Sequence, residues 1–118
     1  MKLVYIYLFL FSAASFSKDT IKKTFNFKEN RSDIIEECFK AHTNDVLHFE
    51  FNSLKDIDFN IHWHKNDDIY FLEKISSIKT NLNNFTIPED DSYCIMFKKR
   101  GEANNEILLQ YYIEPYKA

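Results

Sequence analysis

Three histidines in the middle of the chain are the side chains whose types and spacing could bind a metal. His62 and His64 are separated only by Trp63, in a stretch where hydrophobic and polar residues alternate. Alternation with a period of two is typical of a β-strand, on which residues two apart project from the same face. A His-x-His pair of this kind can chelate zinc.

A third histidine comes from the neighbouring alternating segment. If the two segments form a hairpin with Phe51 opposite Phe59, then His48 lies opposite His62 and Glu50 lies nearby. These residues are on the polar, solvated face, and alternating polar residues on such a face need no metal to explain them. We therefore expect no metal or other cofactor, and we keep ligand or metal binding through the His-x-His strand as the alternative function.

Composition argues against several function classes. The 118 residues include a single glycine, so the glycine-rich loops that cradle phosphates and the GxSxG element of serine hydrolases are excluded. Paired acidic residues fall in predicted turns, where solvation explains them, and we expect no catalytic activity. A net charge of −3 would repel a phosphate backbone, which excludes a nucleic-acid partner.

The first 17 residues have the pattern of a secretory signal peptide. Lys2 precedes an apolar run over residues 3–11, and small residues then provide cleavage sites after Ser15 or Ser17. The run is shorter than the roughly 20 apolar residues of a membrane-spanning helix. We expect cleavage to leave residues 18–118 as one domain with no membrane span, in the lumen of the secretory pathway or outside the cell.

Export gives a meaning to the two cysteines and to two asparagines. Cys38 and Cys94 would meet an oxidising environment, where they could form a disulfide that staples a small core, and two buried free thiols are the alternative. Asn30 and Asn84 each begin an N-x-S/T sequence and are candidate glycosylation sites.

The elements that must position these residues are short strands. Residues 46–52 and 57–64 alternate strictly, and the link over residues 53–56 predicts that they form a hairpin. Asn and Asp take the place of glycine in a second turn over residues 65–68, because their side chains tolerate a left-handed backbone. Together with the strands predicted elsewhere they make an all-β fold, an antiparallel β-sandwich of seven to eight strands. The other predicted strands cover residues 24–28, 36–40, 69–75, 84–87, 92–98 and 106–114.

In chain order, the exported part resembles the GOLD domain, and specifically the lumenal domain of the GOLD-containing cargo receptors that cycle between the ER and the Golgi. The resemblance covers nearly all of residues 20 to 114. It rests on the ordered motifs Thr24-Phe25-Asn26-Phe27, Glu37-Cys38-Phe39, Leu47-His48-Phe49-Glu50-Phe51, Asp56-Ile57-Asp58-Phe59-Asn60-Ile61, Asn66-Asp67-Asp68-Ile69-Tyr70, Phe85-Thr86-Ile87, Ser92-Tyr93-Cys94-Ile95-Met96-Phe97 and the strand from Ile107 to Ile113.

The resemblance implies a jelly-roll-like β-sandwich with a disulfide between Cys38 and Cys94. It also implies a non-catalytic module that binds cargo or membrane-anchored GOLD relatives during transport between the ER and the Golgi. The coiled coil and transmembrane helix of those receptors are missing after Ala118, so we expect a soluble module.

Overall fold

The computed structural model describes residues 19–28, 32–101 and 104–117, and in these ranges the chain is all-β. The predicted fold class, an antiparallel β-sandwich, is confirmed, with six strands in place of seven or eight. The strands are β1 (Ile21–Phe27), β2 (Ile34–Ala41), β3 (Val46–Lys65), β4 (Asp68–Thr86), β5 (Asp91–Lys99) and β6 (Asn105–Glu114).

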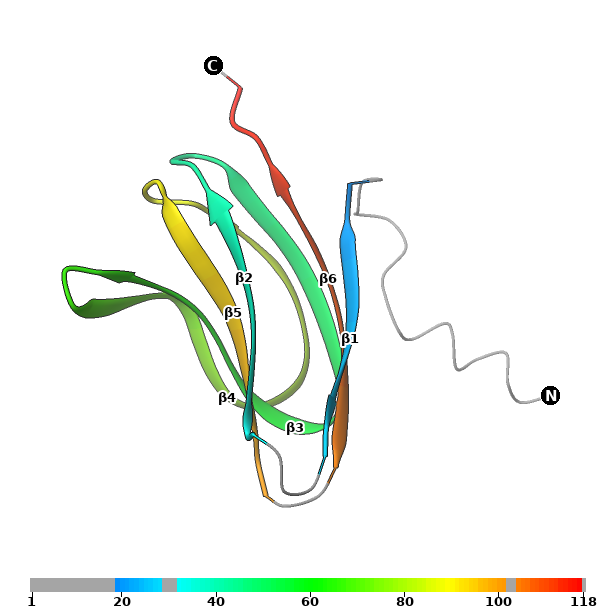
Figure 1. Cartoon of the computed structure of the whole chain (residues 1–118). Coiled ribbons are helices and arrows are strands. Elements are labelled where there is room, and N and C mark those ends of the chain that lie inside the picture. The colour runs from blue at the N-terminus through cyan, green and yellow to red at the C-terminus, as the bar shows by residue number, and fades with distance from the viewer. Residues whose placement is uncertain (1–18, 29–31, 102–103, 118) are drawn as a thin grey trace.

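The number is smaller because two long strands each replace two of the predicted short ones. β3 and β4 form one antiparallel hairpin, and β4 pairs along one side of β3. On its other side, residues 46–53 of β3 pair with β6 and residues 57–63 pair with β5. The sheet therefore curls into two halves that share this hairpin, with β1 at the far edge of the β6 half and β2 at the far edge of the β5 half (Figure 1).

The predicted hairpin link over residues 53–56 is wrong, because these residues are the bend of a continuous strand. Their polar composition resembles a turn, but side-chain hydrogen bonds hold the backbone extended. The Asn105 amide nitrogen donates to Ser53 Oγ at 2.9 Å, and the Lys55 backbone N–H donates to Asn105 Oδ1 at 3.0 Å. The register between β3 and β4 also shifts between Asn52 and Ile57, as expected where a strand bends between two halves of a sheet.

The turn at the far end of the hairpin confirms the expectation that polar residues replace glycine. Asn66 and Asp67 join β3 to β4 and adopt φ values of 53° and 70°. Two left-handed residues match the right-handed twist of the flanking strands, as in a tight type I′ connection.

A core rich in aromatic side chains fills the space between the two halves. Phe59 lies near its centre, with ring centroids 4.8 Å from Phe51, 5.4 Å from Phe49 and 5.8 Å from Phe97. Phe49 and Phe51 belong to one half, whereas Phe59 and Phe97 belong to the other. Successive residues of each strand therefore point alternately to the buried inner face and to the outer face of the sheet. The candidate site lies on the outer face.

The two edge strands are tied to each other through Glu37 of β2. Its carboxylate accepts hydrogen bonds from Lys23 Nζ of β1 at 2.9 Å and from the Tyr111 hydroxyl of β6 at 2.7 Å. Burial and the bond to Glu37 raise the pKa of Tyr111 well above its ordinary value, so the hydroxyl stays protonated and donates.

The predicted signal peptide, residues 1–17, and the glycosylation candidate Asn30 lie outside the described residues. Across the described part of the chain, no helix is long and apolar enough to cross a membrane.

Candidate functional site

A shallow hollow of about 350 Å³ lies on the outer face of the half formed by β2, β5, the second part of β3 and the first part of β4. Strand register explains its composition, because Met96 and Cys94 of β5 lie opposite Asn60 and His62 of β3. The alternation that sends Phe59 and Ile61 inward sends their neighbours outward. The walls are made by Glu36, Asn60, His62, His64, Ile69, Phe71, Lys74 and Met96.

His62 is the buried polar centre of this hollow, with 6% of its surface exposed. Its Nδ1–H donates to Asn60 Oδ1 at 2.7 Å, and its Nε2 lies 3.5 Å from Glu36 Oε2. Burial lowers the pKa of His62 below its ordinary value, although the Glu36 carboxylate opposes this shift, and the nearby His64 adds to the lowering. The ring is therefore neutral at pH 7, with its Nε2 lone pair directed toward the Glu36 side.

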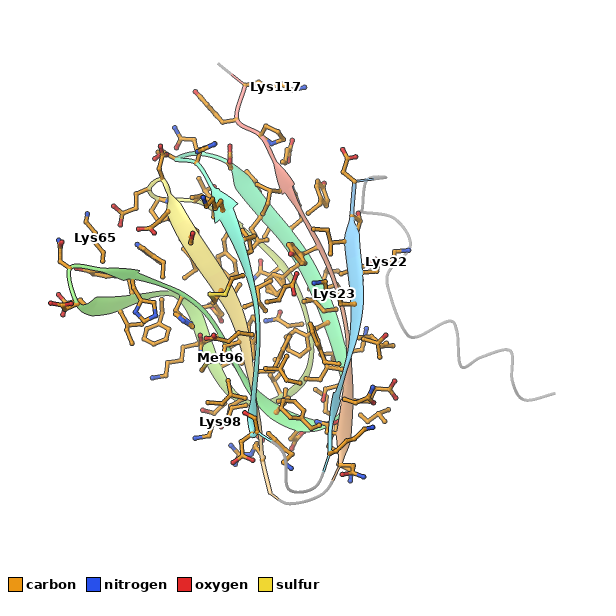
Figure 2. All side chains as sticks on the ribbon, in the orientation of Figure 1. Lys22, Lys23, Lys65, Met96, Lys98 and Lys117 are labelled. Atoms are coloured by element: carbon orange, nitrogen blue, oxygen red, sulfur yellow. A yellow bond between two sulfur atoms is a disulfide. The ribbon has the colours of Figure 1, made fainter. Side chains whose placement is uncertain are left out.

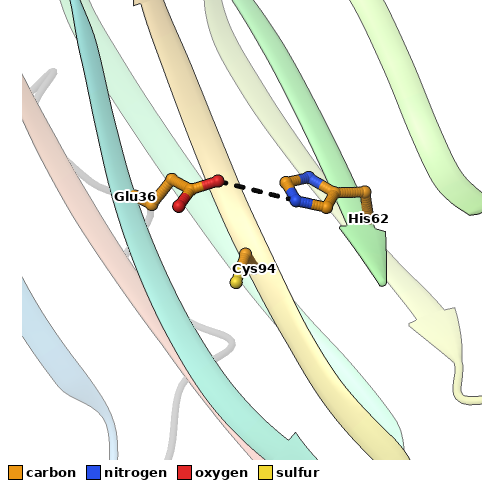
Figure 3. Close-up of side chains that lie close together, drawn as sticks. All are labelled: Glu36, His62 and Cys94. Atoms are coloured by element: carbon orange, nitrogen blue, oxygen red, sulfur yellow. Dashed lines mark ion pairs between the residues drawn. The ribbon is translucent and has the colours of Figure 1, made fainter. Parts of the chain in front are cut away.

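The disulfide lies directly beside His62. Cys38 of β2 and Cys94 of β5 are opposite each other in register, and their sulfur atoms are bonded. Glu36, His62 and Cys94 offer ligand atoms within 4.8 Å of one another, and Figure 3 shows the Glu36 carboxylate and the His62 ring facing each other beside Cys94. Because the Cys94 sulfur is oxidised, this group offers no thiolate to a metal in the disulfide form.

The hollow continues onto the end of the β3–β4 hairpin, residues 63–71, which we call the hairpin end. Ile69, Tyr70 and Phe71 follow its turn and are 52%, 43% and 44% exposed, respectively. The hairpin projects from the body of the molecule (Figure 1), and Lys65 lies near its tip (Figure 2). Three consecutive large apolar residues thus face solvent on a projecting element, which is typical of a protein-binding surface.

Glu89, in the connection between β4 and β5, holds the hairpin end in place. Its carboxylate accepts hydrogen bonds from Trp63 Nε1 at 2.8 Å and from Lys65 Nζ at 2.9 Å. The Trp63 ring also stacks on Tyr70, with ring centroids 5.4 Å apart. Hydrogen bonds from Lys65 and then Trp63 lower the pKa of Glu89 below its ordinary value. The hairpin end is therefore a braced surface.

The predicted histidine cluster is only partly brought together. His62 and His64 share the outer face, with ring centroids 5.2 Å apart. His48 lies in the other half of the same strand, where its Nε2 is 2.8 Å from Glu114 Oε1 and its ring stacks on Tyr112. The predicted register, with Phe51 opposite Phe59, is wrong because residues 46–65 are one strand and not a hairpin.

Some residues of the site were missed by reasoning from the sequence. Glu36 reaches the hollow from β2, a strand that is distant in sequence from His62, and Phe71 reaches it from β4, where it lies opposite His62 in the hairpin register. Ile69, Tyr70 and Phe71 did carry a signal, because three consecutive large apolar residues cannot all be buried on one face of an alternating strand. The glycosylation candidate Asn84 lies on β4 opposite His48, at an exposed position.

No protein-family model matches this chain, and no curated protein matches it in sequence. The solved structures that share its fold include PliG from Aeromonas hydrophila and PliG from Salmonella Typhimurium, each a periplasmic lysozyme inhibitor of g-type lysozyme. The first is 13% identical with a TM-score of 0.59, covering 85% of this chain and 92% of its own. The second is 15% identical with a TM-score of 0.59, covering 85% of this chain and 94% of its own.

These likenesses overturn the GOLD resemblance. The fold is that of the PliG inhibitors, so the predicted GOLD domain, with its setting in transport between the ER and the Golgi, is wrong. The GOLD motifs were short alternating stretches, which many antiparallel sheets share. The supposed central hairpin among them is a single bent strand. The Cys38–Cys94 pair is present in the structure as a disulfide, within a different fold from the one that implied it.

Proposed function

We propose that this chain is an exported, non-catalytic protein that binds a protein partner through the hairpin end. The observation that carries the proposal is the exposure of Ile69, Tyr70 and Phe71 on the projecting and braced hairpin end. Exposed apolar surface is unfavourable in water, and its burial against a partner contributes about 25 cal/mol per Å². Aromatic side chains are also enriched among residues that dominate binding energy.

The bracing by Glu89 favours binding further. A surface that already holds its bound shape loses little conformational freedom on association, so more of the contact energy appears as affinity. Trp63 fixes Tyr70 by stacking, and Glu89 fixes Trp63 by a hydrogen bond. The hollow beside Phe71 could receive a side chain that projects from the partner protein. His62 and Glu36 are the polar groups that it would meet there.

We take the partner to be a lysozyme. The support is the fold shared with two periplasmic inhibitors of g-type lysozyme. The signal-peptide pattern of residues 1–17 and the disulfide support a location outside the cytoplasm. The net charge of −3 favours a partner of positive charge, because complementary charge accelerates association.

The test is a titration of residues 18–118 into g-type lysozyme, with hydrolysis of peptidoglycan and calorimetric binding as the two measurements. We expect inhibition that follows binding, and we expect Tyr70→Ala and Phe71→Ala each to weaken binding about 10-fold or more. The matched control is Leu82→Ala, since Leu82 is 51% exposed in the other part of β4.

Two results would contradict the proposal. An absence of both binding and inhibition would remove lysozyme as the partner. Equal weakening by Leu82→Ala and Phe71→Ala would remove the hairpin end as the binding surface. Circular dichroism spectra of the variants establish that each is folded, so that a loss of binding reports the surface.

A further inference from the structure

Four side chains that could bind zinc lie close together beside the hollow, and two of them are joined in the disulfide. Ligand atoms of Glu36, His62 and Cys94 lie within 4.8 Å of one another, and the fourth side chain, Cys38, is bonded to Cys94. They come from three neighbouring strands, with Glu36 and Cys38 on β2, Cys94 on β5 and His62 on β3. Figure 3 shows three of them, Glu36, His62 and Cys94, close together. The curled sheet therefore fixes their spacing.

The carboxylate oxygen of Glu36 and the Nε2 nitrogen of His62 already face each other, and both are acceptors. Asn60 Oδ1 accepts the Nδ1 proton of His62, which leaves the Nε2 lone pair on the side of the Glu36 carboxylate. Nε2 and Glu36 Oε2 are 3.5 Å apart. A neutral ring whose lone pair faces a carboxylate is an arrangement that a cation stabilises. A hydrogen bond that fixes the tautomer in this way is typical of histidines that bind metals through the other nitrogen.

Reduction would supply the two remaining ligands. A dithiol transfers two electrons and two protons to the Cys38–Cys94 bond and itself becomes a disulfide, which leaves two thiols in this chain. The Cα atoms of these residues are 4.0 Å apart on adjacent strands, so both sulfurs remain at the same place on the sheet. Zinc binding then releases the two thiol protons and forms two zinc–thiolate bonds.

We infer that the reduced chain binds one Zn²⁺ between Cys38, Cys94, His62 and Glu36, and that zinc and the disulfide are alternative staples for β2. Zinc prefers four ligands of this kind in a tetrahedral arrangement. β2 pairs only with β5 among the described strands, so either staple holds an edge strand to the sheet. The zinc form belongs to a reducing environment, before the disulfide has formed. This site does not depend on the identity of the protein partner.

The first experiment compares the oxidised and reduced forms of residues 18–118 by calorimetric titration with zinc. A trialkylphosphine is the reductant, because it takes up the oxygen of one water to give a phosphine oxide and two protein thiols, and it competes weakly for zinc. We expect one zinc per reduced chain and none per oxidised chain. Cobalt in place of zinc should give the thiolate charge-transfer band and the intense visible bands of a tetrahedral site.

The second experiment uses Cys38→Ser, which leaves a free Cys94 thiol beside His62 and Glu36 without any reductant. In this background, we expect His62→Ala and Glu36→Gln each to weaken zinc binding by about 10-fold or more. The matched control is His48→Ala, because His48 lies in the other half of the sheet. The control should bind zinc as tightly as Cys38→Ser alone.

Circular dichroism in the near ultraviolet separates a folded zinc site from thiols of an unfolded chain. If reduction unfolds the protein, zinc must restore the native spectrum, and failure to do so overturns the inference. It is also overturned if the oxidised chain binds zinc equally well. Equal zinc affinity of the His62→Ala and His48→Ala variants in the Cys38→Ser background would overturn it as well.

Discussion

Glu89 links the hairpin end to the connection between β4 and β5 by two hydrogen bonds, from Trp63 and Lys65. We expect Glu89→Gln to lower the free energy of unfolding, because the neutral amide accepts more weakly from Trp63 and Lys65. The pKa of Glu89 is held below its ordinary value of 4.5. Its contribution is therefore complete above pH 4.5 and is lost as the pH falls through the lowered pKa.

Urea unfolding of the wild type and of Glu89→Gln between pH 7 and pH 2 measures this effect. The difference between the two proteins should be largest above pH 4.5 and should shrink in acid. Asp68→Asn is the control, because Asp68 is exposed in the same hairpin. A difference that stayed constant with pH would show that the Glu89 carboxylate does not brace the hairpin end.

His62 should make the folded protein sensitive to mild acid. Its pKa is below the ordinary value of 6.5 because the ring is buried, against the opposing effect of Glu36. As the pH falls through 6.5, the unfolded chain takes up a proton at His62 while the folded chain does not. Stability should therefore decrease as the pH falls from about 6.5 toward the lowered pKa.

The measurement is the slope of the unfolding free energy with pH between 7 and 5. His62→Gln should flatten this slope, whereas His42→Gln should preserve it, since the His42 side chain is 79% exposed. An unchanged slope in His62→Gln would mean that the buried ring is not the group responsible.

At the scale of the element, the long β3–β4 hairpin depends on two local backbone conformations. Its turn places Asp67 at a φ of 70°, and the bend of β4 places Ser77 at a φ of 58°. The Ser77 backbone N–H donates to Asp58 Oδ1 at 3.0 Å, which ties the bend of β4 to β3. Both positions use residues whose short polar side chains or local hydrogen bonds compensate for a left-handed backbone.

Substitution at the turn tests this explanation. Asp67→Val should lower the free energy of unfolding by about 1 to 2 kcal/mol, because a β-branched residue is disfavoured at positive φ. Asp67→Gly should leave stability unchanged or raise it, since glycine adopts this conformation without steric cost. Thermal unfolding of the two variants gives the comparison, and equal melting temperatures would contradict the proposed role of the left-handed turn.

At the scale of the whole molecule, Phe59 joins the two halves of the curled sheet through its contacts with Phe49, Phe51 and Phe97. Phe59→Ala should lower the free energy of unfolding by about 3 to 5 kcal/mol, because a buried ring is lost and a cavity remains. Leu54 is 65% exposed, and Leu54→Ala should change stability by less than about 0.5 kcal/mol. Denaturant unfolding at pH 7 checks both values. A small effect of Phe59→Ala would mean that the halves do not depend on this ring.

Much of the fold was predictable from the sequence, but the pairing of its strands was not. The alternation around Phe49 and Phe59 correctly predicted that these side chains face the core, because a period of two is a local property of the chain. The expectation that the alternate polar face is solvated is wrong for Glu50, Asn60 and His62, which neighbouring strands bury. The polar bend over residues 53–56 has the composition of a turn. Its extended conformation depends on Asn105, which lies about 50 positions away in the chain.

The candidate site, like the fold, was predictable from the sequence only in part. Cys38, Cys94, His62 and His64 were singled out by residue type and spacing, and this required only the sequence. Glu36 joins them because β2 pairs with β5 and β5 pairs with β3, so that three strands place their outer residues in one row. His48 lies outside the cluster because its part of β3 pairs with β6 and not with β5.

The sequence by itself determined that the chain is all-β, that its turns use asparagine and aspartate, and which residues of each strand face inward. These properties depend on backbone preferences and on alternation over a few residues. Only the tertiary structure decided that β3 is one bent strand shared by two halves, that Glu36 meets His62 and the disulfide, and that the hairpin end projects with Ile69, Tyr70 and Phe71 exposed. Such contacts are set by register between distant segments, and register depends on the packing of the whole core.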